Sequence, residues 1–448
     1  MAREIKGVPG RDFGVEDVRG NFPDELEIVP LKKPPDAEVG VPGSKSITNR
    51  ALILAALAAG RSTISNPLFS DDTFWLMQAL VQLGFEVFAD VPGRRVEVVG
   101  LGGRIPAGKA DIFVGNAGTV ARFLPPFLAL GRGVYRLDGT PRMRERPVSD
   151  LVDALRALGV RVDYEEDEGR FPIVVHGGGI PGGSVTVPGD KSSQFLSGLL
   201  LAAPYTREGL SLKVGGQLVS KPYVEITARM MRSFGGTLES FEGGYRVSPG
   251  AYRARHYAVE PDASAASYFF AVAAATGGRI RVAGLPPNAI QGDLRFVHLL
   301  KRMGCQVAFD AGVVEVRGPE RLRGIDADMG DISDTMMTLA AIAPFADRPT
   351  TMTGLGHTRH QETDRLSAVA RELSRLGVRV EERVNSLRII PGKDRRLRRG
   401  LVRTYDDHRM AMSFAVAGLV AEGIRIENPG CVTKTLPGYF GLLEGLRG

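Results

Sequence analysis

The stretch GSKSITNRALILAALAAG (residues 43–60) determines the fold class, because the chain repeats its pattern. A turn rich in glycine and serine leads into a run of alanine, leucine and isoleucine. Such a run predicts a buried helix, since a helix that is apolar all round leaves no face for water. The pattern returns about every 70 to 75 residues, in residues 115–131, 189–204, 260–278, 330–346 and 405–423.

A second pattern recurs with the same period. Polar amphipathic segments end in glycine, the residue that most readily adopts the left-handed conformation found at helix ends. These glycines are Gly84, Gly159, Gly235, Gly304 and Gly377. Short strand-like runs lie between the two helices of each repeat, at residues 62–66, 134–138, 210–214, 279–283, 350–353 and 424–427. One or two more strands follow each glycine, as in residues 378–382 and 386–390.

One repeat therefore consists of strand, buried helix, strand, amphipathic helix, strand and strand. Six such repeats in 448 residues exceed one ordinary hydrophobic core. The sequence predicts an α/β fold of two similar domains, each of three βαβαββ repeats.

The composition narrows the class of protein. Hydrophobic residues make up 43% and charged residues 24%, as in globular proteins. The longest apolar runs have about half the length of a bilayer span, and the N-terminus lacks the apolar core of a signal peptide. Two cysteines, Cys305 and Cys431, exclude a disulfide framework and fit a reducing compartment. We expect a cytoplasmic protein with no membrane partner.

Cations gather where the helices begin. The starts of the buried helices carry Lys45, Arg50, Arg122, Lys191 and Arg409, and the amphipathic helices add Arg142, Arg144, Arg146 and Arg365, with Lys434 before the last one. A cation in the first turn opposes the helix dipole unless an anion neutralises it. The pattern, with a net charge of +6, predicts a site for small, multiply anionic ligands.

The sequence is less consistent with a P-loop, a metal site or a nucleic-acid site. Residues 43–46 lack the glycine spacing of a P-loop, and the six histidines show no metal-ligand spacing, so neither a metal nor a cofactor is predicted. A nucleic-acid binder with a basic cleft needs aromatic residues among the cations, but aromatic residues make up only 7% of the chain, which has a single tryptophan, Trp75.

Eleven short motifs now appear in order along the chain: VPGSKSITNRAL, GNAGT, RMRERP, SSQFLSGLLLAAP, SKPY, EPDASAASYF, QGD, ISDTMMTLA, ETDRL, YDDHRMAM and KTLPGYF. With them the chain resembles the EPSP synthase family of enolpyruvyl transferases from about Glu27 to Phe440. The resemblance implies one domain from residues 26–43 and 261–448, a second from residues 44–260, and an N-terminal extension of residues 1–25. It also implies an active site in the interdomain cleft, a monomer, and no nucleic-acid partner.

The reaction implied by the resemblance moves the enolpyruvyl group of phosphoenolpyruvate to the 5-hydroxyl of shikimate 3-phosphate. Carried over position by position, Asp334 accepts the hydroxyl proton, Glu362 donates a proton to the methylene carbon, and Lys45 reaches both substrates. The phosphoenolpyruvate contacts are Lys45, Gly118, Arg146, Gln194, Arg365, Arg409 and Lys434. The shikimate 3-phosphate contacts are Lys45, Ser46, Arg50, Ser192, Ser193, Gln194, Ser220, Tyr223, Asp334 and Gln361. The resemblance also implies inhibition by glyphosate, which competes for the phosphoenolpyruvate site.

Three positions depart from the family pattern. Gln361 stands where many relatives have lysine, His357 replaces a frequent asparagine, and Phe123 occupies a position that is proline in some relatives. Two further readings stay open. One is the sister transferase that acts on UDP-N-acetylglucosamine, which typically uses a reactive loop cysteine in the first half of the chain, where this sequence has none. The other is a catalytically inactive relative, against which the presence of Asp334 and Glu362 argues.

Overall fold

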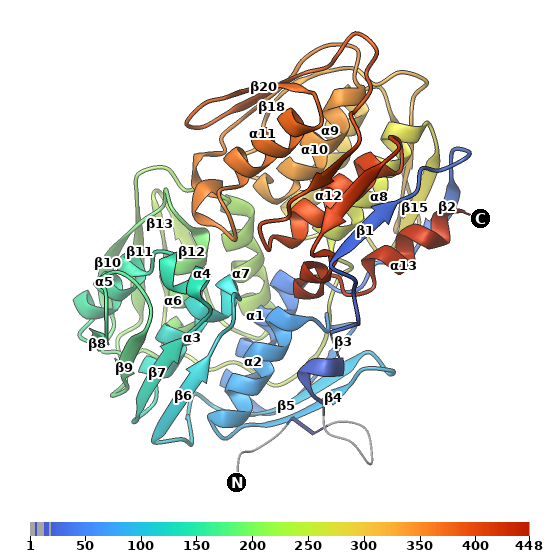
Figure 1. Ribbon diagram of the computed structural model, residues 1–448. Coiled ribbons are helices and arrows are strands. Elements are labelled where there is room, and N and C mark those ends of the chain that lie inside the picture. Colours follow the sequence, from blue (N-terminus) through green and yellow to red (C-terminus); the bar gives the residue numbers. More distant parts are fainter. Residues whose placement is uncertain (1–4, 7–12, 18, 448) are drawn as a thin grey trace. The chain divides into compact units, whose positions relative to one another are not determined.

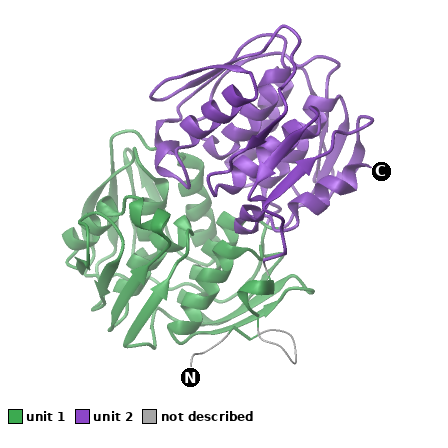
Figure 2. Cartoon of the chain, in the orientation of Figure 1, with its two compact units in different colours: residues 1–18, 43–259 green, residues 19–42, 260–448 purple. Residues whose placement is uncertain are grey.

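Two compact units make up the chain in the computed structural model, which describes residues 5–6, 13–17 and 19–447 (Figure 1). Unit 1 comprises residues 1–18 and 43–259, and unit 2 comprises residues 19–42 and 260–448 (Figure 2). The chain therefore leaves unit 2 after Pro42 and returns to it at Glu260.

One four-stranded sheet of unit 1 contains the whole repeat. In spatial order its strands are β6 (Lys109–Phe113), β7 (Val134–Asp138), β9 (Ile173–His176) and β8 (Arg161–Tyr164). β6 and β7 are parallel, whereas β9 is antiparallel to both β7 and β8. α3 (Gly118–Ala129) lies between β6 and β7 in the chain, and α5 (Ser149–Ala157) lies between β7 and β8. This order is the one predicted from the sequence.

Four further sheets among the described residues have the same strand order. In unit 1 they are β10 (Gly183–Pro188), β11 (Leu210–Gly215), β13 (Gly244–Val247) and β12 (Glu239–Phe241), and β14 (His256–Ala258), β3 (Ala59–Ser65), β5 (Arg95–Leu101) and β4 (Glu86–Asp90). In unit 2 they are β18 (Asp326–Asp328), β19 (Thr350–Thr353), β21 (Leu387–Ile390) and β20 (Arg379–Glu382), and β2 (Asp36–Val39), β15 (Arg279–Ala283), β17 (Val313–Arg317) and β16 (Gln306–Asp310).

Two of these sheets take their first strand from a distant part of the chain. β2 precedes α1 (Lys45–Leu57) in sequence but pairs in parallel with β15. β14 precedes α8 (Ala263–Thr276) but pairs in parallel with β3. Each strand thus stays in one unit while the helix that follows it belongs to the other.

The last repeat is completed by the beginning of the chain. β22 (Gly400–Val402) is parallel to β23 (Ile424–Glu427), and β23 is antiparallel to β1 (Glu25–Ile28). β1 therefore occupies the place that the fourth strand of the repeat holds in the other sheets. Unit 2 needs residues from both ends of the chain for this reason.

Three buried helices pack against one another in each unit, as the apolar runs predict. In unit 1 these helices are α1, α3 and α6 (Ser193–Ala202), and in unit 2 they are α8, α10 (Met336–Ile342) and α12 (His408–Gly418). Every residue of α3 and α12 is buried. Burying one large apolar side chain contributes about 1.5–3 kcal/mol, so these helices supply much of the stability of each unit.

The amphipathic helices of five repeats end as expected. They are α2 (Asp71–Gln82), α5, α7 (Lys221–Ser233), α9 (Phe296–Arg302) and α11 (Arg365–Arg375). The five predicted terminal glycines all have a positive φ, from +84° to +105°. Glycine adopts this conformation without the strain that a side chain would cause. The positive φ values confirm the predicted helix ends.

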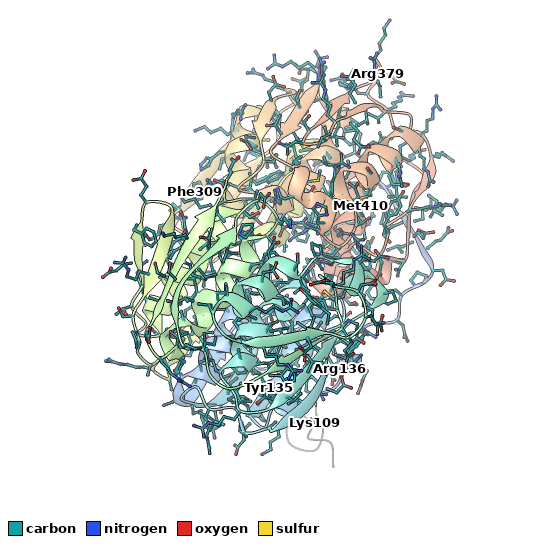
Figure 3. The ribbon with its side chains drawn as sticks, turned by 90° about the vertical axis from the view of Figure 1, so that its left-hand side faces the viewer. Lys109, Tyr135, Arg136, Phe309, Arg379 and Met410 are labelled. Carbon is teal, nitrogen blue, oxygen red and sulfur yellow. The ribbon has the colours of Figure 1, made fainter. Side chains whose placement is uncertain are left out.

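The strands alternate between a buried and a solvated face. Tyr135 on β7 is fully buried and its hydroxyl donates to the carbonyl of Ala107, 2.8 Å away. The next residue, Arg136, points to the other face and pairs with Glu165 and Asp111 (Figure 3). The buried helices therefore cover one face of each sheet, since successive side chains of a strand point to opposite faces.

The described N-terminal residues lie along the edge of a unit 1 sheet. The amide of Lys6 donates to the carbonyl of Val87 (3.1 Å), and the amide of Ala89 donates to the carbonyl of Lys6 (2.7 Å). The ring of Phe13 meets the edges of Phe69 and Phe74. The hydrogen bonds of Lys6 cover part of β4, an edge strand that could otherwise pair with another chain.

Candidate active site

In unit 2 the guanidinium of Arg365 joins carboxylates from three segments of the chain. Arg365 is 1% exposed and is the first residue of α11. It donates over 2.9 Å to each of three residues, Asp334, Glu362 and Asp407. Burial lowers the pKa of Arg365, but the three carboxylates outweigh this effect and raise it above its usual value.

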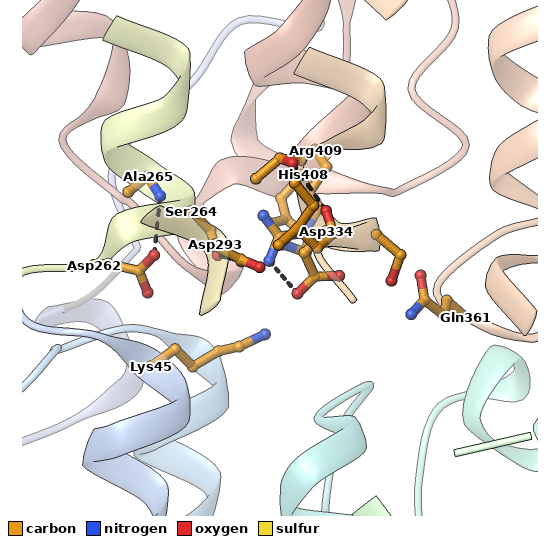
Figure 4. Close-up of polar contacts among 12 residues, drawn as sticks. Lys45, Asp262, Ser264, Ala265, Asp293, Asp334, Gln361, His408 and Arg409 are labelled. Atoms are coloured by element: carbon orange, nitrogen blue, oxygen red, sulfur yellow. Dashed lines mark hydrogen bonds and ion pairs between the residues drawn. The ribbon is translucent and has the colours of Figure 1, made fainter. Parts of the chain in front are cut away.

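Asp334 bridges two arginines. It lies in a 3₁₀ turn (Ser333–Thr335) directly before α10, at the predicted start of the fifth buried helix. One oxygen accepts from Arg365, and the other accepts from Arg409 over 2.7 Å (Figure 4). Two charge-assisted hydrogen bonds favour the ionised form of this carboxylate.

Glu362 lies between two cations. One oxygen accepts from Arg365, and the other is 3.8 Å from the Nζ of Lys434. Glu362 and Lys434 are both buried, and Lys434 ends the 3₁₀ turn Pro429–Lys434. Gln361, which precedes Glu362, accepts a hydrogen bond from Arg365 through its side-chain oxygen. The structure thus brings together five of the predicted site residues of unit 2 around Arg365.

Asp407 was not predicted as a site residue. It is fully buried and caps α12, where its side chain accepts from the amide of Arg409 over 2.9 Å. It also accepts from Nε of Arg365. An aspartate before a helical run is a recognisable cap, and this signal could have drawn attention to it. Asp407 and Asp334 also explain how Arg409 is tolerated in the first turn of a buried helix.

Two more buried groups of unit 2 contact this cluster. The hydroxyl of Tyr268 accepts from Arg409 over 3.2 Å, and burial raises the pKa of Tyr268 to about 12. Asp293 is 3% exposed and accepts a hydrogen bond from the hydroxyl of Ser264. Burial and the charge of Asp334 raise the pKa of Asp293 to about 7. Neither residue was predicted for the site, although Asp293 lies in the QGD motif and Tyr268 in the EPDASAASYF motif.

In unit 1 Lys45 is held by a carboxylate. Lys45 opens α1, and its Nζ lies 3.0 Å from Oδ2 of Asp72, in the first turn of α2. Ser46 follows it, and the Ser46 carbonyl accepts from the side chain of Arg50. The sequence indicated Lys45 but not Asp72, which lies 27 positions further along the chain.

Arg50 is enclosed by neutral groups. It is 1% exposed and donates to Thr227, Ser197 and the carbonyl of Tyr223, over 2.7, 3.2 and 3.0 Å. Burial lowers the pKa of Arg50 to about 10. In this structure Arg50 ties α1 to α6 and α7, and its contact with shikimate 3-phosphate stays a prediction.

Arg146 lies beside the start of α3. Its Nη1 donates to the carbonyl and to the side-chain oxygen of Asn116, both over 3.3 Å. A methyl group on Gly118 would stand 2.6 Å from Nη2 of Arg146. Glycine at this position therefore allows the guanidinium to approach the backbone at the helix N-terminus.

The predicted serine contacts lie where α6 and α7 begin. The side chain of Ser192 caps α6 by accepting from the amide of Gln194 over 3.2 Å, and Ser193 is the first residue of the helix. Ser220 precedes α7 with a left-handed backbone (φ +51°), and Tyr223 lies in the first turn. α6 and α7 pack against each other, so these predicted residues share one end of a helix pair.

Three further predicted cations also pair with carboxylates. Two expectations about the helices in which the predicted cations lie are wrong. Lys191 pairs with Asp150, Arg142 with Glu145, and Arg144 with Asp138. Lys191 precedes α6 instead of lying in it, because the helix starts only after the Ser192 cap. Arg142 and Arg144 lie in a separate short helix, α4 (Pro141–Glu145). Arg146 lies between α4 and α5, because Pro147 disfavours a helical conformation of the residue before it.

Comparison with known proteins identifies the family. Residues 31–443 match the family model EPSP synthase (3-phosphoshikimate 1-carboxyvinyltransferase). The chain belongs to this family. It is 47% identical over 419 residues to the 3-phosphoshikimate 1-carboxyvinyltransferase of Trichormus variabilis, which covers 93% of this chain and 98% of that one. The predicted resemblance and the transferase class are confirmed.

Two solved structures have the same fold as this chain. The EPSP synthase from Acinetobacter baumannii has a TM-score of 0.80 at 24% identity, over 94% of this chain and 98% of that one. The enolpyruvyl transferase NikO from Streptomyces tendae has a TM-score of 0.74 at 19% identity, over 94% and 97%. These likenesses confirm the predicted fold class. Among the described residues, no helix has the length and apolar character needed to cross a membrane.

All three departures from the EPSP synthase pattern have partners in the structure, and that of Gln361 is Arg365. Phe123 lies under Arg50, with the guanidinium carbon 5.1 Å from the ring centroid. His357 lies 2.9 Å from the hydroxyl of Ser333, and burial lowers its pKa. The lower pKa favours a neutral imidazole, so His357 supplies a hydrogen bond next to Asp334 in place of the amide of asparagine.

Proposed function

We propose that this protein transfers the enolpyruvyl group of phosphoenolpyruvate to the 5-hydroxyl of shikimate 3-phosphate and releases phosphate. The observation that supports this most is the cluster around Arg365, which pairs with both Asp334 and Glu362, while Arg409 is a second partner of Asp334 and Lys434 lies near Glu362. Two carboxylates in different surroundings can serve as base and acid in one reaction.

In the addition step, Asp334 takes the proton from the 5-hydroxyl while the hydroxyl oxygen bonds to C2 of phosphoenolpyruvate. Glu362 gives a proton to the methylene carbon, C3, which makes C2 electrophilic. In the elimination step, C3 returns a proton to Glu362, the bond between C2 and the phosphate oxygen breaks, and the departing phosphate takes the proton held by Asp334. The products are the enol ether and inorganic phosphate. The hydrogen bonds from Arg365 and Arg409 to Asp334 keep the acceptor aligned for the first step.

Cations bind the phosphoenolpyruvate carboxylate and phosphate in this proposal. Arg146, Arg365 and Arg409 each offer a planar fork of N–H donors, whereas Lys45 and Lys434 act as point charges. The backbone at Gly118 and the amide of Gln194 supply neutral donors. Charge developing on the departing phosphate is stabilised by the same groups.

Hydroxyl and amide side chains suit shikimate 3-phosphate, which carries hydroxyl groups as well as two anionic groups. We assign to it Ser46, Ser192, Ser193, Ser220, Tyr223 and Gln361, together with Lys45, Arg50, Gln194 and Asp334. The serines lie at the N-termini of α6 and α7, and helix N-termini favour a phosphate. We further propose that the enzyme works as a cytoplasmic monomer, without a cofactor and without a nucleic-acid partner.

The test is phosphate release from phosphoenolpyruvate, measured with and without shikimate 3-phosphate. We expect release only with the acceptor, and none with UDP-N-acetylglucosamine in its place. Lys434→Ala should lower turnover at limiting phosphoenolpyruvate by at least about tenfold, because a charged hydrogen-bond donor is lost. The control is Arg379→Ala, which removes an exposed cation on β20 and should leave turnover unchanged (Figure 3). Equal release with and without the acceptor contradicts the proposal.

A further inference from the structure

Arg122 is a buried cation that the reaction itself does not use. It lies one turn after Gly118 in α3 and is 3% exposed. Its Nη2 donates to the carbonyl of Pro147 over 2.9 Å, and its Nη1 lies 3.0 Å from the sulfur of Met143. The guanidinium also faces the ring of Phe171, 5.9 Å from the centroid.

The two partners of Arg122 flank Arg146 in sequence. Met143 is fully buried in α4, and Pro147 directly follows Arg146. The amide of Arg146 donates to the carbonyl of Met143 over 3.1 Å, which closes a turn between the two contacts. Arg122 therefore contacts the chain on both sides of Arg146, through the side chain of Met143 and the backbone of Pro147.

The side chain of Arg146 meets α3 at a second point. Asn116, just before that helix, accepts from its guanidinium over 3.3 Å. These hydrogen bonds are long, so they constrain the guanidinium weakly. The hydrogen bond from Arg122 to Pro147, at 2.9 Å, is a shorter contact between α3 and this segment.

We infer that Arg122 is a positioning residue for Arg146, which sets the place of that guanidinium through Met143 and Pro147. The inference rests on the proposed role of Arg146 in binding phosphoenolpyruvate. Arg122 reaches a backbone carbonyl and a thioether, which lie on either side of Arg146 in sequence. Arg122 fixes the position of the segment, because one rigid guanidinium reaches two acceptors at once.

The test compares Arg122→Met with Arg156→Met. Arg156 is a matched control in the same repeat: it donates to a backbone carbonyl (Val162, 2.8 and 3.0 Å) and faces an aromatic ring (Tyr164, 4.9 Å), but it holds a different segment. A displacement of about 1 Å in a binding group costs up to about 100-fold. Arg122→Met should therefore raise KM for phosphoenolpyruvate about 10- to 100-fold and KM for shikimate 3-phosphate less than about threefold. Arg156→Met should change neither by more than about twofold.

A double variant separates this inference from the proposed function. If Arg122 acts through Arg146, Arg122→Met adds less than about twofold to KM for phosphoenolpyruvate in an Arg146→Ala background. A full additional effect in that background, or an equal rise in both KM values, overturns the inference. An Arg146→Ala variant with unchanged KM contradicts the proposed role of Arg146 instead. If Arg122→Met does not fold, Arg122→Lys is measured instead, because lysine keeps the charge but reaches only one acceptor. The same criterion applies: KM for phosphoenolpyruvate should rise more than KM for shikimate 3-phosphate.

Discussion

The Nζ of Lys45 lies 3.0 Å from Oδ2 of Asp72, a carboxylate that is 2% exposed. The two residues begin neighbouring helices, α1 and α2, which pack against each other. A lysine side chain has four rotatable bonds, so its head group has no fixed place unless a partner holds it. Asp72 provides that partner and so holds the proposed contact of both substrates in one position.

Asp72→Asn should lower kcat/KM for both substrates by about 10- to 100-fold, because Lys45 loses its charged partner while the side-chain shape is kept. Steady-state kinetics with each substrate varied in turn measures the effect. Asp71→Asn, one residue earlier in the same helix turn, is the control and should remain within about twofold of the wild type. Equal effects of the two variants contradict a specific role of Asp72.

Gly118→Ala should weaken binding at the phosphoenolpyruvate site. The added methyl group would stand 2.6 Å from Nη2 of Arg146, so the guanidinium must move. We expect KM for phosphoenolpyruvate to rise about tenfold, and glyphosate to inhibit the variant less than the wild type. Gly441→Ala is the control, since a Cβ there meets no atom within 4 Å. Unchanged inhibition of Gly118→Ala by glyphosate contradicts this prediction.

Asp407→Asn should lower the free energy of unfolding by about 3 kcal/mol, at the lower end of the range for breaking a buried ion pair, because Arg365 keeps two other carboxylates. Asparagine caps helices as well as aspartate does, so the effect isolates the ion pair. Asp364→Asn is the matched control: it caps α11 and pairs with Arg359 at the surface, where such a pair contributes about 0–1 kcal/mol. Denaturant titrations of both variants measure the difference, and similar losses would argue against a buried ion pair at Asp407.

Asp293 should make the protein less stable as the pH rises from about 4 to about 7. Its pKa is about 7 in the folded protein, through burial and the charge of Asp334, and about 3.9 when unfolded. In this interval the folded state binds the extra proton, so the free energy of unfolding falls with increasing pH and then levels off. Asp293→Asn removes this loss, and its stability relative to the wild type should increase between pH 5 and pH 7. Parallel stability curves for the two proteins contradict the assignment.

Neither cysteine should react in the folded protein. Burial raises the pKa of Cys305 to about 12 and that of Cys431 above its usual range, so almost no thiolate is present at pH 7.5. We expect iodoacetamide to leave activity unchanged and to label both thiols only after denaturation. Loss of activity in step with labelling of one cysteine would favour the sister transferase, which works through a reactive cysteine.

The sequence alone determined the local features of each repeat. An apolar run such as residues 51–59 predicts a buried helix, and Gly84 predicts where the following helix ends. These features depend on neighbours within about one helical turn, so one chain segment contains all the information. Cations such as Lys45 and Arg409 could be placed at helix starts for the same reason.

Only the tertiary structure decided how those cations are neutralised. The pattern of charges predicted bound anions, but the structure brings internal carboxylates to them: Asp72 to Lys45, and Asp334 and Asp407 to Arg365. These pairs are separated by 27 to 42 positions in the chain, and they form because α1 packs against α2, and α10 packs against both α11 and α12. A charge in a region of low dielectric constant needs a partner, and helix packing determines which residue becomes that partner.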